Sequence, residues 1–149
     1  MQINMAVEPL VREAFGAAVG QDIDRNIVAM KNMVDRGDAG VQDSLNLAGA
    51  VATFALFDIH DGERPDDEQL HDLAKSFVEM ESWAAFDEQA ALTFLTALAD
   101  RTSVDGLPSE TVTRLAFVMG AWLLAAFGPE DRKWYDYLDQ ILNALESAP

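Results

Sequence analysis

The 149-residue sequence contains no cysteine and only two histidines. The absence of cysteine excludes disulfide bonds, thiolate metal sites and a cysteine nucleophile. The sequence also has no glycine-rich phosphate loop, no Gly-x-Ser-x-Gly turn and no recognisable Ser-His-Asp arrangement. Because a catalytic site needs a nucleophile or general base and a group that positions it, we expect a protein that is not an enzyme.

Basic residues are scarce, with 10 Lys and Arg against 26 Asp and Glu and a formal net charge of −16. Nucleic acids and anionic membranes are bound through Lys and Arg. We therefore expect no nucleic-acid partner and no membrane insertion. A cation or a basic protein is the partner that fits this charge, although high acidity also serves solubility alone.

Long hydrophobic runs are also missing. The N-terminus has no apolar segment like that of a signal peptide. The apolar run at 115–127 is shorter than the roughly 20 residues that a membrane span requires. Together with the missing cysteines, this pattern leads us to expect a cytoplasmic location.

Two stretches without charge are expected to form the core. No residue from Leu115 to Phe127 is polar, and Leu45 to Phe57 has nearly the same character. A helix that is apolar on every face must be covered on every face. The sequence therefore predicts one all-α domain over residues 1–149, a helical bundle with 45–57 and 115–127 as its central helices.

Apolar residues elsewhere recur at helical spacing, for example Ile23, Ile27, Met30 and Val34, and no stretch alternates with the period of a strand. Residues 1–6 read as a lead-in, Gly37 to Gly40 as a turn, and Gly128-Pro129 as the stop of the central helix. The pattern predicts about seven helices, near residues 8–19, 22–36, 41–60, 66–83, 87–101, 109–127 and 130–147.

The order of segments hints at an internal repeat. An apolar helix, Gly62, an acidic segment and an amphipathic helix are followed later by an apolar helix, Gly128, Glu130-Asp131 and a second amphipathic helix. This order is compatible with two pseudo-repeated helical hairpins, but common patterning rules would also produce it by chance.

Acidic residues are most concentrated between Asp58 and Glu88. This segment contains eleven Asp and Glu, and its only Lys and Arg are Arg64 and Lys75. Asp61, Asp66, Asp67 and Glu68 surround one Gly- and Pro-containing turn, and such oxygen-rich turns suit hard cations. The alternative is helix-start chemistry, because acids in a first turn favour the helix dipole. The turn is not an EF-hand, because Phe57 stands where the first ligand should be.

Both histidines are followed by aspartate, as His60-Asp61 and His71-Asp72. A His-Asp metal phosphohydrolase needs further, well-separated ligands, which this sequence does not supply. Asp58, at the end of an apolar helix, is the nearest case of a carboxylate that could reach a buried active site.

Residues 47–94 resemble the TerB-like family of tellurite-resistance proteins. An apolar helix ends in Asp61-Gly62, polar residues and Asp67-Glu68 follow, and Phe86-Asp87 opens a short helix. The resemblance implies an all-helical stress-response protein that binds a divalent cation, Ca²⁺ or Mg²⁺, through Asp61, Glu68 and Asp67. The second unit departs from the family pattern, since Phe127 stands where an Asp should precede Gly128.

Two hypotheses for function follow. The first is a non-enzymatic TerB-like protein with a cation at the Asp61–Glu68 turn. The second is an acidic inhibitor or immunity protein that masks a basic protein surface, because complementary charge speeds association.

Overall fold

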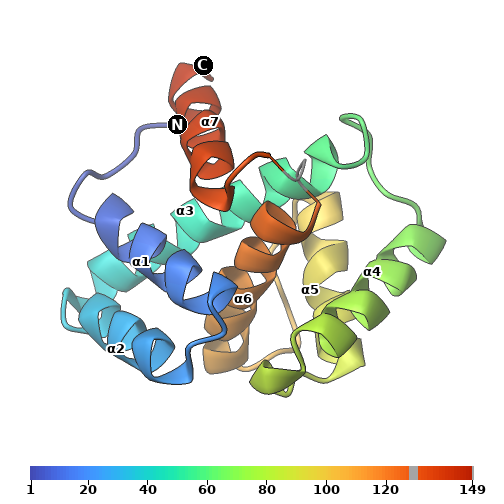
Figure 1. Ribbon diagram of the computed structural model, residues 1–149, viewed down its shortest axis with the longest axis horizontal. Helices are drawn as coiled ribbons and strands as arrows, with labels where there is room; N and C mark the ends of the chain where they lie inside the picture. The colour runs from blue at the N-terminus through green and yellow to red at the C-terminus, as the bar shows by residue number, and fades with distance from the viewer. Residues whose placement is uncertain (128–130, 149) are drawn as a thin grey trace.

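The computed structural model describes residues 1–127 and 131–148, which form a single all-helical domain (Figure 1). The described residues contain seven α-helices and no β-strand. The helices are α1 (Glu8–Val19), α2 (Ile23–Val34), α3 (Gly37–Asp58), α4 (Asp67–Met80), α5 (Glu88–Asp100), α6 (Ser109–Ala126) and α7 (Trp134–Ser147), with a 3-10 turn, η1 (Ser82–Ala84), between α4 and α5. The predicted fold class is confirmed.

Helix α6 lies in the middle of the molecule, with α1 on one side and α5 on the other (Figure 1). Its residues from Leu115 to Leu124 are all buried, and α1 and α3 pack most extensively against it. The predicted central position is confirmed there, but Ala125 to Phe127 are exposed. Phe127 instead rests edge-on against Trp122, with ring centroids 4.9 Å apart, so the apolar stretch ends at the surface.

The crossing of α1 and α6 depends on Gly120. A Cβ atom at this position would lie 2.6 Å from Cε1 of Phe15, which is fully buried. The ring of Phe15 also packs against Phe117, with centroids 5.7 Å apart. The missing side chain of Gly120 therefore allows α1 to approach α6 closely.

Several helix boundaries differ from the prediction for local reasons. Helix α3 begins at Gly37 rather than Val41. Gly37 adopts a left-handed φ of 83°, so the chain turns between α2 and α3 at this residue and the rest of the predicted turn is helical. It ends at Asp58 rather than His60, since the amide of Gly62 bonds the carbonyl of Phe57 and the next residues turn back. Helix α4 stops at Met80 instead of Trp83, and η1 follows it.

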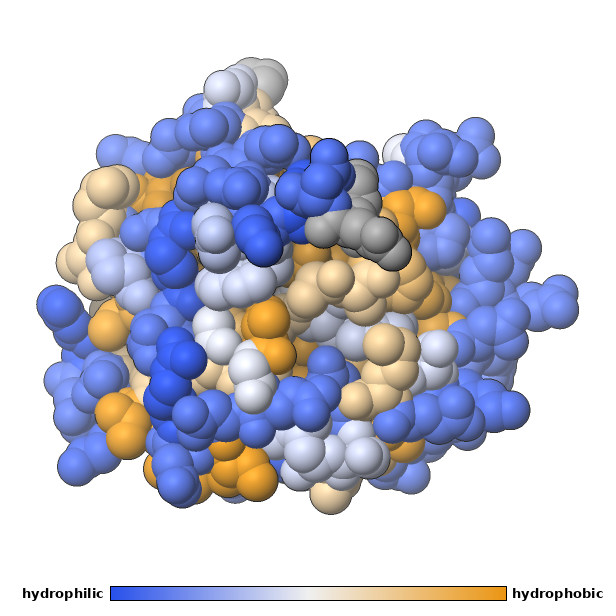
Figure 2. Space-filling model, viewed as in Figure 1, coloured by the Kyte–Doolittle hydropathy of each residue, from blue (hydrophilic) through white to orange (hydrophobic). Residues whose placement is uncertain are grey.

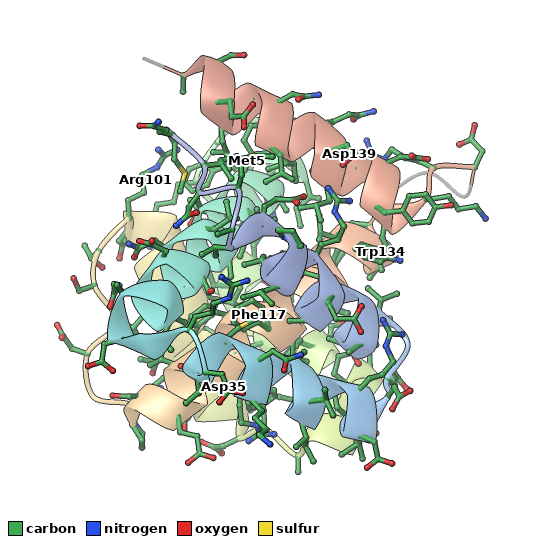
Figure 3. The ribbon with its side chains drawn as sticks, turned by 90° about the vertical axis from the view of Figure 1, so that its left-hand side faces the viewer. Met5, Asp35, Arg101, Phe117, Trp134 and Asp139 are labelled. Atoms are coloured by element: carbon green, nitrogen blue, oxygen red, sulfur yellow. The ribbon has the colours of Figure 1, made fainter. Side chains whose placement is uncertain are left out.

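The start of the last helix was also predicted too early. Helix α7 begins at Trp134, after Lys133 in an extended conformation. The predicted stop at Gly128-Pro129 and the predicted start at Glu130 lie outside the described residues. Helix α7 is attached to α1 through Arg12, whose Nη2 lies 2.7 Å from Oδ1 of Asp139 (Figure 3).

The N-terminal lead-in is attached to the domain. Ile3 and Val7 are buried in the core, and the amino group of Met1 donates to the carbonyl of Leu145 at 2.8 Å. This contact brings the first residue beside the end of α7, as Figure 1 also shows.

Helix α2 leaves most of its regularly spaced apolar residues exposed. It packs on α1 and α3 through the buried residues Ala29 and Met33. Ile23, Ile27 and Val34 are instead 53%, 61% and 65% exposed. Hydrophobic surface is accordingly visible at the lower left of Figure 2, over α2. The helical spacing predicted an amphipathic helix correctly, but its longest apolar stripe does not face the core.

The two predicted hairpins are packed differently. Helix α7 returns onto α6 and α3, whereas α4 packs mainly on α5. The two segments therefore do not form equivalent units. None of the helices in residues 1–127 and 131–148 is both long and apolar enough to cross a bilayer.

The Gly120 contact gives a first prediction. Gly120→Ala should destabilise the protein by about 1–3 kcal/mol, because the new methyl group overpacks a buried aromatic contact. Gly49→Ala in α3 is the matched control, since no atom lies within 4 Å of a Cβ at this position. The control should be neutral or stabilising by up to about 1 kcal/mol through helix propensity. Urea unfolding measures both, and equal effects would contradict this role of Gly120.

Candidate functional site

The predicted cation-binding turn connects α3 to α4. Asp61 and Gly62 adopt left-handed φ values of 57° and 85°, which reverse the chain. Pro65 is buried and directs the chain toward α4, where Asp66 is the N-cap residue rather than the first helical residue. Asp61 and Gly62 therefore have a structural role, because they reverse the chain after α3.

Asp66 forms a capping box at the start of α4. Its Oδ1 accepts from the amide of Gln69 at 2.8 Å, and the Gln69 side chain accepts from the amide of Asp66 at 2.8 Å. Such reciprocal bonds satisfy two backbone donors that the helix leaves free. The helix-start interpretation of Asp66 is therefore confirmed.

The three proposed ligands are exposed but do not converge. Asp67 lies 3.8 Å from Nη1 of Arg64, whose Nε bonds Oδ1 of Asp100 at 2.8 Å. Asp61 and Glu68 have no ion-pair partner in the described part of the chain. Across residues 1–127 and 131–148, no three His, Cys, Asp or Glu side chains are grouped closely enough to hold a metal ion. Cation binding here stays a prediction.

The two histidines have different surroundings. Nδ1 of His60, just after α3, lies 2.8 Å from the carbonyl oxygen of Leu56 in that helix, so the ring is held against α3. His71 is exposed on α4. Neither histidine belongs to a metal-binding group within the described residues.

Asp58 is exposed and joins α3 to α7. The hydroxyl of Tyr137 donates to Oδ2 of Asp58 at 2.5 Å, and the guanidinium of Arg132 lies 3.8 Å from the centre of the Tyr137 ring. Burial, and secondarily the Asp58 carboxylate, raise the pKa of Tyr137 well above its ordinary value. This arrangement holds the phenol protonated, and we interpret it as a bond that fixes α7 to α3.

A buried carboxylate that the sequence analysis missed lies at the other end of the molecule. Glu81, between α4 and η1, is 9% exposed. Its Oε2 accepts from Nε1 of Trp83 at 2.5 Å and from Nε2 of Gln21 at 3.0 Å. Burial raises the pKa of Glu81, while these two hydrogen bonds act in the opposite direction. No sequence signal distinguishes Glu81 from the exposed acids nearby, because its burial depends on the turn between α1 and α2.

Two apolar grooves are open at the surface. One, of about 640 Å³, lies between α3, α5 and the loop after α5, and Arg101 is the charged residue among its lining side chains. No Asp, Glu or His lines it, so it offers no general base. The second, of about 460 Å³, lies between α2, the start of α3 and the first half of α6, with Met30, Leu45 and Phe117 in its lining.

Comparisons with family models, curated proteins and solved structures found no match to this chain. The resemblance to the TerB-like family therefore stays a prediction, and conclusions on function depend on the geometry of the chain itself. Among the described residues, that geometry offers exposed carboxylates over α4, the buried carboxylate of Glu81, and an exposed apolar face on α2.

Glu81 gives a prediction for pH dependence. A carboxyl group whose pKa is raised by folding binds its proton more tightly in the native state. Its contribution to stability is therefore complete below its ordinary pKa and is lost as the pH rises through the raised pKa. Glu81→Gln removes the buried charge and keeps an oxygen that can accept both hydrogen bonds. This variant should be more stable than the wild type at pH 7.

The measurement is urea unfolding between pH 4 and pH 7.5. The advantage of Glu81→Gln should shrink as the pH falls, because the wild-type carboxyl becomes neutral. Glu79→Gln is the matched control, since Glu79 is exposed. A stability difference for Glu81→Gln that does not change with pH would contradict the assignment.

Proposed function

We propose that this chain is a non-enzymatic, cytoplasmic binding protein that masks a basic surface of another protein. The supporting observation is a row of charged residues on α4, here named the α4 stripe: Glu68, Asp72, Lys75 and Glu79. These residues are exposed and recur at spacings of three and four, so they share one side of the helix. Hydrophilic surface over α4 forms the right-hand edge of Figure 2.

The carboxylates of the α4 stripe are available to an external cation. Five ion pairs occur among the described residues, and none of them includes Glu68, Asp72 or Glu79. A basic protein surface could therefore pair with them without displacing an existing partner. Such complementarity increases the association rate and the specificity more than the affinity.

Helix α4 is also held in place firmly enough to present this row of charges. Its opposite side buries Leu70, Leu73, Ala74 and Phe77. The ring of Phe77 packs against Phe86 at 5.6 Å and against Trp122 of α6 at 5.4 Å between centroids. A preorganised surface loses less entropy on binding than a flexible acidic tail would.

The proposal predicts that removing charge from α4 weakens binding to a basic probe. Glu68→Gln, Asp72→Asn and Glu79→Gln together should lower the affinity for polylysine by about tenfold, since three exposed pairs contribute about 0.5 kcal/mol each. Calorimetry at low salt measures the affinity, and added salt should weaken it further.

The matched control removes three exposed acids from other parts of the surface, namely Asp35, Asp105 and Glu146. Both variants have the same net charge, so long-range attraction changes equally. If the control loses as much affinity as the α4 variant, polylysine recognises net charge only and the proposed role of α4 is wrong.

A TerB-like cation-binding role is the second candidate. It is favoured by the exposure of Asp61, Asp67 and Glu68 around one turn, and by the absence of an ion pair to Asp61 or Glu68 in the described part of the chain. Asp67 would have to exchange Arg64 for the cation. At 3.8 Å and with an 89% exposed side chain, that pair is weak enough to allow this exchange.

The corresponding prediction concerns Ca²⁺ and Mg²⁺. If the turn binds either ion, amide shifts during titration to millimolar concentrations should cluster at residues 61–68. Asp61→Asn combined with Glu68→Gln should abolish them, because two of the three carboxylate ligands are lost. Asp105→Asn combined with Glu146→Gln provides the charge-matched control. The absence of clustered shifts in the wild type would exclude the cation role.

A further inference from the structure

Helix α2 carries an apolar face that no other part of the described chain covers. Ile23, Ile27 and Val34 are each more than half exposed, while Ala29 and Met33, on an adjacent side of the helix, are buried. Single exposed apolar residues are ordinary, but Ile23, Ile27 and Val34 are spaced by four and seven residues, so they share one side of this 12-residue helix. Several exposed apolar residues on one side of a helix are typical of an interaction surface.

The spacing within this patch is that of a helix-pairing seam. Ile23, Ile27, Met30 and Val34, here named the α2 seam, are separated by four, three and four residues. This is the alternation by which the apolar residues of one helix pack against a second helix. Met30 is half-buried. Together with Leu45 and Phe117 it lines the groove of about 460 Å³ beside α2. Figure 3 shows Phe117 in the space bounded by α1, α2 and α3.

The charge around α2 contrasts with the rest of the molecule. Residues 22–38 hold four acidic and three basic residues, whereas the remaining chain holds 22 acidic and seven basic ones. Two copies of a chain with a net charge of −16 repel one another over most orientations. Contact through α2 brings their least acidic surfaces together. A basic partner, in contrast, would be attracted to other parts of the surface.

Two charges beside the seam complement those of a second copy of this chain. Asp24 and Lys31 are seven residues apart, so they lie on the same edge of the seam, and both are exposed. Neither forms an ion pair in the described part of the chain. An antiparallel pairing of two α2 helices places Asp24 of each copy near Lys31 of the other. A parallel pairing would place like charges at the same level.

We propose that α2 is a homodimer interface, in which the seams of two copies pack antiparallel about a two-fold axis. The occupant of the exposed face is therefore a second copy of this chain. Helix α2 spans about 18 Å, so the contact lies at the small end of protein interfaces. The dimer forms in the micromolar range and leaves α4, on the opposite side of Figure 1, free.

Sedimentation velocity of the full chain from about 5 to 500 µM tests this proposal, in about 0.3 M salt to screen the net repulsion. The wild type should shift from monomer to dimer over this range. Ile27→Asp combined with Val34→Asp should stay monomeric at all concentrations. Both residues are exposed, so the variant should retain its far-ultraviolet spectrum. Met5→Asp is the control for an exposed apolar residue outside α2, and it should dimerise as the wild type does.

Charge reversal tests the antiparallel arrangement. Asp24→Lys or Lys31→Asp alone places like charges together and should weaken the dimer, whereas the two changes combined should restore it. A wild type that stays monomeric at 500 µM would overturn the proposal. Dimerisation that survives Ile27→Asp with Val34→Asp, or a double reversal that fails to restore the dimer, would also overturn it. None of these variants changes the α4 stripe, so polylysine binding remains an independent test of the proposed function.

Discussion

The burial of α6 is the constraint on which the rest of the structure depends. A ten-residue segment of it, from Leu115 to Leu124, is buried, so neighbours must cover every side of the helix. Helices α1 and α3 provide most of this cover, α5 and α7 add to it, and α4 reaches it through Phe77 and Trp122. Gly120 sets the closest of these contacts, because its missing side chain admits the ring of Phe15.

The helices around α6 expose surfaces of different kinds. Helix α2 packs on α1 and α3 and keeps a second apolar side exposed. Helix α4 lies across α5, with its buried side fixed by aromatic contacts and its charged side exposed. One core therefore supports two surfaces of contrasting chemistry, a nearly neutral apolar one and an acidic one. These surfaces, rather than an enclosed cavity, carry the functional proposals.

The two carboxylates held by Tyr137 and by Trp83 illustrate how polar groups stabilise the edges of this core. Asp58 receives the hydroxyl of Tyr137 and links α3 to α7. Glu81 receives two neutral donors and links the end of α4 to the turn after α1. The pKa of Glu81 is raised, because its burial outweighs the hydrogen bonds that stabilise its charge.

The sequence by itself determined the all-helical class, the approximate helix spans and the central position of residues 115–124. These features depend on local periodicity and capping, as Asp66 and Gln69 illustrate at the start of α4. Only the tertiary structure decided that the α2 seam is exposed, that Glu81 is buried and that Asp61, Asp67 and Glu68 do not converge. The physical reason is that helical spacing shows which residues share a face, whereas the helices that cover this face come from distant parts of the chain.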